Sequence, residues 1–460
     1  MINETENITT PETSKASTPY NPSKPYNPSN ASKASNASNA FPKKVLIITY
    51  YWPPSGGAGV QRWLKFSKYL PEYGWEPVIL TVDPAYATYP AIDSSLVKEV
   101  PEGIMVFKTA ATDWFRIYSK DKAKVPAAGF AVNADNTLKG RISRFIRGNF
   151  FIPDPRRGWN RYAIRKATEI INDLDIRHVI TTSPPHSTQL IGLKLKKRFQ
   201  GIRWIADLRD PWTDIYYYNQ FYHMFPVIHA DRKYEINVLR RADHVITVGR
   251  TLKDLFNSKL PGTSGKIQVV TNGFDEDDFK GLQSSAPEIF TISYIGTLSD
   301  SYPVEGFTGA IAGLLRTNIK MIVRFIGSVP ASIKATLLST FPPEILEFIN
   351  YVSHTDAIRY MLGSSALLLI IPDHRSNKSI VTGKLFEYLA CNKPVICIGP
   401  TDGDAADIIR ESGAGATFSY EDSPGITGYI KKLLENNYPE GKDHEKYSRK
   451  YLAGLISGSL

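Results

Sequence analysis

A short glycine-rich segment, residues 55–59 (SGGAG), follows an apolar run and precedes a helical pattern. Glycines at the carboxyl end of a strand let the backbone approach a phosphate, and the next helix offers free N–H groups and a positive dipole end. Gly56 and Gly57 are therefore candidate phosphate-binding residues, with a simple tight turn as the alternative. No Gly-Lys-Ser/Thr follows, which excludes a P-loop. The spacing also departs from Gly-x-Gly-x-x-Gly, although Asp83 keeps an NAD-linked oxidoreductase as the least favoured alternative.

A second candidate anion site lies in residues 380–390 (IVTGKLFEYLA). Thr382 can cap a helix there, so that the first N–H groups, including that of Gly383, point outward. Lys384 adds a positive charge, and Glu387 follows about one turn later on the same face. This helix end would bind a diphosphate while Glu387 accepts hydrogen bonds from ribose hydroxyls. The alternative is a capped amphipathic helix whose glutamate faces solvent.

A third candidate site combines residues 181–186 (TTSPPH) and residues 206–212 (ADLRDPW), each at the end of an apolar run. Two prolines end the first strand and place His186 in a loop, where a histidine can bind a sugar or move a proton. In the second segment Arg209 could pair with one of the two acids, Asp207 and Asp210, which leaves the other to accept from an acceptor hydroxyl. The alternatives are a satisfied loop histidine and a buried Asp–Arg pair that ties loops together.

Residues 141–166 are strongly basic, with one acid, Asp154, and with interleaved aromatic side chains. The whole chain carries a formal charge of +10, which favours anionic partners without choosing among them. Single-stranded nucleic acid is one interpretation, but no recognisable nucleic-acid module surrounds the stretch, and we expect no nucleic-acid partner. An anionic membrane surface is the second interpretation. A solvated helix face is the third.

The composition predicts a cytoplasmic protein of more than one domain. With 460 residues the chain is too long for a single core. Residues 1–40 contain no Leu, Val, Phe or Trp, so we expect a disordered low-complexity tail. No apolar run approaches the roughly 20 residues of a membrane span. We also expect no secretory signal, because no basic-then-apolar segment opens the sequence. Cys391 and Cys397, interpreted as buried core residues, fit a reducing compartment.

The candidate sites must be positioned by alternating strands and helices. The apolar runs that predict strands are residues 45–51, 77–82, 178–182, 203–206, 244–248, 266–270, 290–294, 321–326, 367–371 and 394–398. Residues 109–160 interrupt the alternation and are expected to be irregular. The pattern predicts an α/β protein of two doubly wound Rossmann-like domains, with ligands at the carboxyl ends of the strands and in a cleft between the domains.

At this point the sequence resembles the GT-B glycosyltransferases, specifically the retaining family 4 group and its bacterial members of surface-polysaccharide assembly. The motifs that carry the resemblance are the Gly-Gly loop and residues 271–275 (TNGFD), 294–297 (YIGT), 325–327 (FIG), 353–358 (SHTDAI) and 383–394 (GKLFEYLACNKP). The resemblance implies transfer of a sugar from a nucleotide-diphosphate sugar to a hydroxyl of a glycan or lipid-linked acceptor, with retention. It implies no cofactor beyond this donor and no metal.

The resemblance also implies roles for individual residues. Glu387 would bind the nucleotide ribose, and Lys384 would stabilise the charge that develops on the departing diphosphate. Asp210 or His186 would orient or deprotonate the acceptor. The remaining donor-binding candidates are Gly56, Gly57, Thr297, Thr382 and Gly383.

Two departures from the family pattern keep alternatives open. Ser379 stands eight positions before Glu387, where many members carry a glutamate that contacts the transferred sugar. Asp373 or backbone groups of residues 378–381 would have to replace it. The acceptor-side His-x-His segment is also missing, and residues 181–186 stand in its place. A non-catalytic nucleotide-sugar-binding scaffold and a GT-B nucleotide-sugar 2-epimerase therefore remain as alternatives.

The domain boundaries follow from the composition shifts and the resemblance. Residues 1–41 form the tail, 42–280 the acceptor-side domain, 281–289 a linker and 290–425 the nucleotide-sugar-binding domain. Residues 426–460 are expected to form helices that cross back to the first domain. Because family members often act on lipid-linked acceptors, we expect a peripheral position on the inner face of the plasma membrane.

Overall fold

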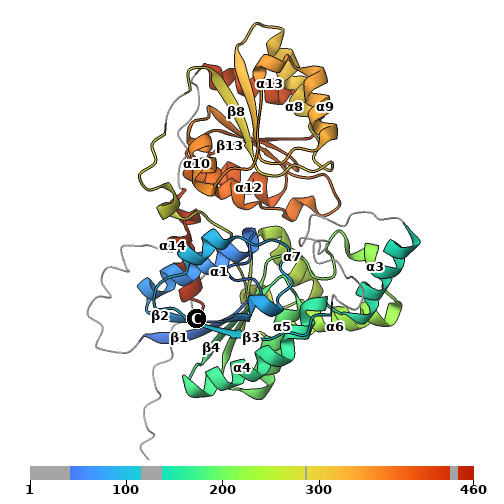
Figure 1. The fold of residues 1–460 in the computed structure, drawn as a ribbon, viewed down its shortest axis with the longest axis vertical. Coiled ribbons are helices and arrows are strands. Elements are labelled where there is room, and N and C mark those ends of the chain that lie inside the picture. Colours follow the sequence, from blue (N-terminus) through green and yellow to red (C-terminus); the bar gives the residue numbers. More distant parts are fainter. Residues whose placement is uncertain (1–41, 115–136, 285–286, 436–443) are drawn as a thin grey trace, which may run out of the picture. The chain divides into compact units, whose positions relative to one another are not determined.

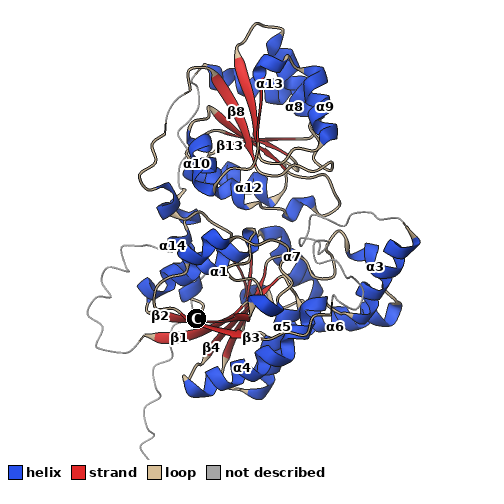
Figure 2. Cartoon of the chain, viewed as in Figure 1, coloured by secondary structure: helices blue, strands red, loops and turns tan. Residues whose placement is uncertain are grey.

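The computed structural model describes residues 42–114, 137–284, 287–435 and 444–460. The predicted tail, residues 1–41, lies outside the described residues. The described chain contains two parallel β-sheets, one of seven strands and one of six (Figure 1). Helices flank both faces of each sheet (Figure 2).

The first sheet has the strand order β3-β2-β1-β4-β5-β6-β7, and neighbouring strands pair in parallel. Its strands are β1 (Lys43–Ile48), β2 (Trp75–Val82), β3 (Met105–Thr109), β4 (His178–Ser183), β5 (Arg203–Leu208), β6 (His244–Thr247) and β7 (Ile267–Val269). Its helices are α1 (Ala58–Tyr69), α3 (Leu138–Phe150), α4 (Asn160–Asp173), α5 (Ser187–Arg198), α6 (Phe225–Arg241) and α7 (Arg250–Lys259). The chain winds outward from β1 to β3 and then resumes at β4, so the order reverses between β1 and β4.

The second sheet has the order β10-β9-β8-β11-β12-β13 and is also parallel. Its strands are β8 (Phe290–Ile295), β9 (Met321–Ile326), β10 (Leu346–Ile349), β11 (Ala366–Ile370), β12 (Val395–Ile398) and β13 (Gly415–Phe418). Its helices are α8 (Glu305–Leu315), α9 (Ala331–Thr340), α10 (His354–Leu362), α11 (Gly383–Ala390), α12 (Asp404–Ser412) and α13 (Ser423–Leu434). Short 3-10 helices that bear on the site are η6 (Pro155–Trp159), η7 (Tyr218–Phe221), η9 (Glu276–Phe279) and η11 (Asn377–Ser379).

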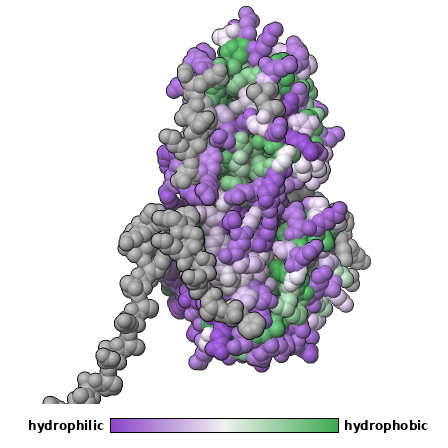
Figure 3. All heavy atoms as spheres, turned by 90° about the vertical axis from the view of Figure 1, so that its left-hand side faces the viewer, coloured by the Kyte–Doolittle hydropathy of each residue, from purple (hydrophilic) through white to green (hydrophobic). Residues whose placement is uncertain are grey.

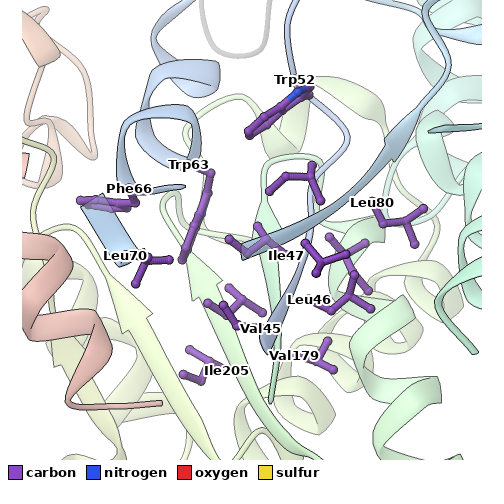
Figure 4. Packing of buried hydrophobic residues seen from close by; sticks show 14 of the residues in the cluster. Val45, Leu46, Ile47, Trp52, Trp63, Phe66, Leu70, Leu80, Val179 and Ile205 are labelled. Carbon is purple, nitrogen blue, oxygen red and sulfur yellow. The ribbon is translucent and has the colours of Figure 1, made fainter. Parts of the chain in front are cut away.

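The core of the first sheet explains why its strands read as continuous apolar runs. Residues 45–48 of β1 are fully buried, because helices cover both faces of the sheet. Trp63 and Phe66 of α1 lie together with these β1 side chains and with Leu80 of β2 (Figure 4). On the face shown in Figure 3, hydrophilic residues predominate and hydrophobic areas lie between them.

The predicted α/β class with two doubly wound Rossmann-like sheets is confirmed, but three strands were not predicted. These are β3, β10 and β13, and each is an edge strand. None of them contains a fully buried residue. An edge strand that is half exposed needs no continuous apolar run, and this is why the sequence pattern missed all three.

The expectation of an irregular region over residues 109–160 is wrong for its second half. Helix α3 forms there, and the side chain of Thr137 accepts a capping hydrogen bond from the Gly140 N–H. Residues 115–136 of the region lie outside the described residues. A solvated helix face is one of the three interpretations given above for the basic stretch, which contains most of this helix.

The last helix, α14 (Arg449–Ser457), and the preceding α-helix, α13, pack into different hydrophobic cores. Leu452, Ala453 and Ile456 of α14 belong to the core of the first sheet. Ile426 and Ile430 of α13 belong to the core of the second sheet. The polypeptide therefore passes from one core to the other between α13 and α14.

Candidate functional site

The amino terminus of α11 is open. Thr382 occupies the cap position with extended backbone, but its side chain makes no capping hydrogen bond, which corrects the predicted cap. Within the described part of the chain, its buried Oγ1 has no hydrogen-bond partner. The N–H of Gly383 and its neighbours in the first turn thus have no side-chain acceptor from Thr382. A buried hydroxyl without a partner beside a positive helix end is suited to an anionic ligand.

Lys384 lies in this first turn and is held by the end of β8. Its Nζ donates to the Tyr294 Oη at 2.8 Å, and the Tyr294 hydroxyl donates in turn to the carbonyl oxygen of Thr297. Gly296, at φ +122°, makes room for the lysine, since a Cβ there would come within 2.5 Å of the Lys384 Cε. Burial lowers the pKa of Lys384 to about 8, while the Glu387 charge opposes that shift. The hydroxyl partner leaves the ammonium charge unneutralised.

Glu387 lies one turn after Lys384 and is hydrogen-bonded through one oxygen. Its Oε1 is 3.0 Å from the Nε2 of His354, which is the first residue of α10. The Glu387 side chain is 22% exposed. This hydrogen bond raises the pKa of His354 above its usual range. The sequence motif SHTDAI contains His354, but nothing in the sequence pattern connected it with Glu387.

The glycine-rich loop positions the start of α1. Gly57 has φ +97°, a conformation that favours glycine, and it caps α1 without a side chain. The Gly56 N–H donates to the carbonyl of Ala91 at 2.9 Å, so this amide is already used. That the Gly57 loop and α11 hold one diphosphate between them stays a prediction.

A buried Asp–Arg pair exists at the third candidate site, but with a different arginine from the one expected. Asp207 pairs with Arg62 of α1, and both side chains are fully buried. Arg209 instead donates to backbone carbonyls, at 2.9 Å to Ser183 and at 2.9 Å to Gly59. The sequence could not identify Arg62, because the pair joins α1 to β5 across 145 residues of chain.

His186 and Asp210 have different properties as proton acceptors. The ring of His186 stacks on Trp212 with centroids 4.9 Å apart, and burial lowers its pKa to about 3. Such an imidazole is a poor base at neutral pH. Burial raises the pKa of Asp210, and the nearby Arg209 opposes this. Of the two predicted groups, Asp210 is therefore the better base.

Ser379, at the position of the missing glutamate, and Asp373, the carboxylate considered as its substitute, make local hydrogen bonds. The Ser379 hydroxyl donates to the carbonyl of Ser376 at 3.0 Å. Asp373 accepts from the side-chain amide of Asn377 at 3.4 Å. Beside them, His374 stacks on Tyr216 of the loop after β5, with centroids 4.2 Å apart. This aromatic pair was not predicted, because its members come from loops that follow strands of two different sheets.

The basic stretch 141–166 is divided by the fold into a buried and an exposed part. Asp154 accepts from the N–H and the hydroxyl of Ser187, and Arg156 and Trp159 are buried, so this part is structural. The exposed part consists of helix α3 together with Arg157, Arg161 and Arg165. No helix among the described residues is long and apolar enough to cross a membrane. The described residues also contain no group of three His, Cys, Asp or Glu suited to a metal ion.

Comparison with known proteins agrees with this architecture. Residues 125–278 match the family model for Glycosyltransferase Family 4. No curated protein matches the sequence. The prediction that the chain is a family 4-like GT-B glycosyltransferase is confirmed by this match and, for the fold, by solved structures.

Three solved structures illustrate the similarity of fold. HepE from Anabaena, in complex with UDP and glucose, has a TM-score of 0.55 and 12% identity, over 91% of this chain and 99% of the other. The apo lipopolysaccharide outer core galactosyltransferase WaaB has a TM-score of 0.55 and 12% identity, over 91% and 100%. A protein described as a UDP-N-acetylglucosamine 2-epimerase from Listeria monocytogenes has a TM-score of 0.51 and 11% identity, over 90% and 94%. At these identities the likeness shows the fold alone.

Proposed function

We propose that this protein transfers a sugar from a nucleotide-diphosphate sugar to a hydroxyl of a lipid-linked or polysaccharide intermediate of cell-surface glycan synthesis, with retention. The observation that carries the proposal is the first turn of α11, which contains an uncapped helix end, the unpartnered Thr382 hydroxyl and Lys384, whose ammonium forms no ion pair with an acid among the described residues. Glu387 follows one turn later. The bound ligands of HepE and the activity named for WaaB support the choice of donor and acceptor class.

The chemistry assigned to these groups follows from charge. As the bond between the sugar C1 and the diphosphate oxygen breaks, negative charge develops on the leaving phosphate. Lys384 and the α11 N–H groups stabilise that charge without reorganisation. The acceptor oxygen, oriented by Asp210, forms the new bond to C1 on the same face. Because the new bond forms on the face from which the phosphate leaves, the configuration at C1 is retained, and the acceptor's proton passes to the departing phosphate.

Glu387→Ala is expected to weaken binding of a nucleoside diphosphate by about 10- to 100-fold, because hydrogen bonds to a carboxylate contribute about 1.5–3 kcal/mol. Calorimetric titration with UDP, GDP and NAD measures this and distinguishes the donor classes. Glu344→Ala, on an exposed residue of the same half of the chain, is the matched control. Unchanged affinity in Glu387→Ala would refute the ribose role.

The alternative functions make different predictions for the same sample. An epimerase would interconvert UDP-N-acetylglucosamine and its 2-epimer without an acceptor. We include this assay because the fold is similar to that of the Listeria protein. A scaffold binds nucleotide sugar but turns none over. The scaffold alternative rests on Ser379, which stands where many family members carry a sugar-binding glutamate. The Ser379 hydroxyl donates to a backbone carbonyl instead.

The proposal includes peripheral binding to an anionic membrane through one surface, which we call the α3 surface. It consists of exposed apolar side chains on α3 and on residues 222–225, where Phe225 is 82%, Leu138 73% and Phe150 69% exposed. The side chain of Asn149 joins the two segments, donating to the Tyr222 carbonyl at 3.1 Å and accepting from the Met224 N–H.

The basic residues of the α3 surface favour an anionic membrane as its partner. Helix α3 (LKGRISRFIRGNF) contains several basic residues and no acid. The guanidinium groups of Arg141 and Arg144 lie over the Tyr222 ring, next to the exposed apolar side chains. Anionic headgroups complement such charges, at about 1 kcal/mol for each basic residue near the surface. Shallow insertion of the apolar side chains would add to the affinity.

Phe150→Ser/Phe225→Ser is expected to reduce binding to vesicles of phosphatidylglycerol and phosphatidylcholine by at least about tenfold, since both insertable rings are lost. Co-sedimentation measures it, and binding of the unaltered protein should fall with added salt. Tyr351→Ser is the matched control, because Tyr351 is an aromatic residue of the other half of the chain and is 88% exposed. Vesicle binding that is insensitive to salt and to the double substitution would exclude this surface.

A further inference from the structure

The carboxylate of Glu387 has a specific partner. Among the described residues, His354 is the one whose side chain hydrogen-bonds it, with 3.0 Å between Nε2 and Oε1. The two residues belong to different helices, α10 and α11, so the contact exists only after the second sheet has folded. It uses one oxygen of the carboxylate, and Oε2 has no hydrogen bond to the described residues.

The start of α10 fixes the imidazole in this place. Ser353 caps α10, and its hydroxyl oxygen accepts from the Asp356 N–H. His354 is therefore the first residue of a capped helix, and its ring projects from an ordered backbone. Its side chain is 39% exposed, so a ligand bound at Glu387 can approach the pair from solvent.

Other charged groups lie near the pair, and two kinds of contact describe them: ion pairs around Lys65, and a buried Arg449 whose Nη1 has no hydrogen-bond partner among the described residues. Lys65 of α1 forms ion pairs with Asp275 and Asp278, at 2.9 and 2.8 Å. Asp278 and Lys65 act on His354 with opposite signs. Burial lowers the pKa of Arg449 of α14, and the charges of the two aspartates and of Glu387 oppose this shift. These groups surround the pair, but His354 makes the hydrogen bond that orients the carboxylate.

A glutamate side chain has several rotatable bonds, and a ligand that needs it in one orientation must restrict them on binding. A hydrogen bond that holds the carboxylate beforehand removes part of this cost. Because only Oε1 is held, Oε2 keeps its capacity to accept. The geometry is that of a preset acceptor with one oxygen reserved for a ligand.

We propose that His354 is a positioning residue for ribose recognition: it holds Oε1 of Glu387 so that Oε2 accepts from a ribose hydroxyl of the nucleotide. This inference rests on the proposed function and deepens it by adding a residue that the family resemblance did not assign. It predicts that His354 matters only for nucleotides that carry ribose hydroxyls.

The test compares UDP with 2′,3′-dideoxyuridine diphosphate by calorimetric titration of the full chain. His354→Phe is expected to weaken UDP binding about tenfold and to leave binding of the dideoxy nucleotide unchanged. His354→Gln, whose amide N–H can replace the Nε2 donor, should restore most of the UDP affinity. His229→Phe, at an exposed histidine of α6, is the matched control.

The nucleotide titrations distinguish a failure of the His354 role from a failure of nucleotide-sugar binding, the function on which that role rests. Equal losses for both nucleotides in His354→Phe would show a merely structural role and overturn the inference. Tighter UDP binding in that variant would also overturn it, because His354 would then compete with the ribose for Glu387. If the unaltered protein binds no nucleoside diphosphate from the UDP and GDP panel, the proposed function itself fails. Thermal unfolding of each variant verifies that it is folded.

Discussion

Lys384→Met is expected to lower sugar transfer by at least about a hundredfold, because the variant loses the ammonium group that we propose lies beside the leaving diphosphate. Methionine has a similar length and is apolar, so it can occupy the space beside Gly296 without leaving an uncompensated charge. The Tyr294 hydroxyl keeps its hydrogen bond to the Thr297 carbonyl. Release of free nucleoside diphosphate in the presence of acceptor, with the donor chosen by titration, measures the effect.

The pH dependence of binding tests the same group in the unaltered protein. The pKa of Lys384 in the free protein is lowered to about 8 by burial, and a bound diphosphate raises it. The affinity for a nucleoside diphosphate should therefore be highest below pH 8, where Lys384 is protonated. It should fall by up to about tenfold per pH unit as the pH rises above 8. The Lys384→Met variant should lack this decrease. Lys431→Met, at an exposed lysine of α13, is the control that should keep both activity and pH dependence. An active Lys384→Met variant with the same pH profile would contradict the assignment.

Arg62→Met is expected to destabilise the protein by about 3–5 kcal/mol, because it leaves the buried Asp207 carboxylate without its cation. Arg62 donates to Asp207 through Nε and Nη2, at 3.2 and 3.1 Å, and through Nη1 to the Thr271 carbonyl at 2.8 Å. In the variant Asp207 keeps only neutral donors, the indole of Trp63 and the hydroxyl of Thr182. Urea denaturation followed by tryptophan fluorescence measures the free energy of unfolding.

Two further variants show whether the buried charge is the cause. Arg177→Met removes an exposed pair with Asp175 and should change the free energy of unfolding by less than about 0.5 kcal/mol. Arg62→Met/Asp207→Leu removes both buried charges and should recover part of the loss, although Trp63 and Thr182 then lack their acceptor. A loss below about 1 kcal/mol in Arg62→Met would show that water or a rearranged side chain compensates Asp207.

The fold was largely determined by patterns that can be seen in the sequence. Strands buried on both faces require continuous apolar residues, and the run from Val45 to Ile48 shows this. The central strands were therefore predictable, whereas the edge strands β3, β10 and β13 were not, since exposure relaxes the requirement. The GKLFEYLA motif likewise placed Lys384 and Glu387 on one helix, because a helix fixes the spacing of residues that are close in the chain.

Contacts between distant segments were decided only by the tertiary structure. The cation for Asp207 is Arg62 rather than the adjacent Arg209, the partner of Glu387 is His354, and the hydroxyl that holds Lys384 comes from Tyr294. Burial also separated His186, whose pKa falls to about 3, from Asp210, whose pKa rises. Local sequence spacing carries no information on which surfaces pack together. The sequence by itself therefore determined which central strands and helices form and where the candidate anion-binding motif lies, and packing determined which side chains meet there.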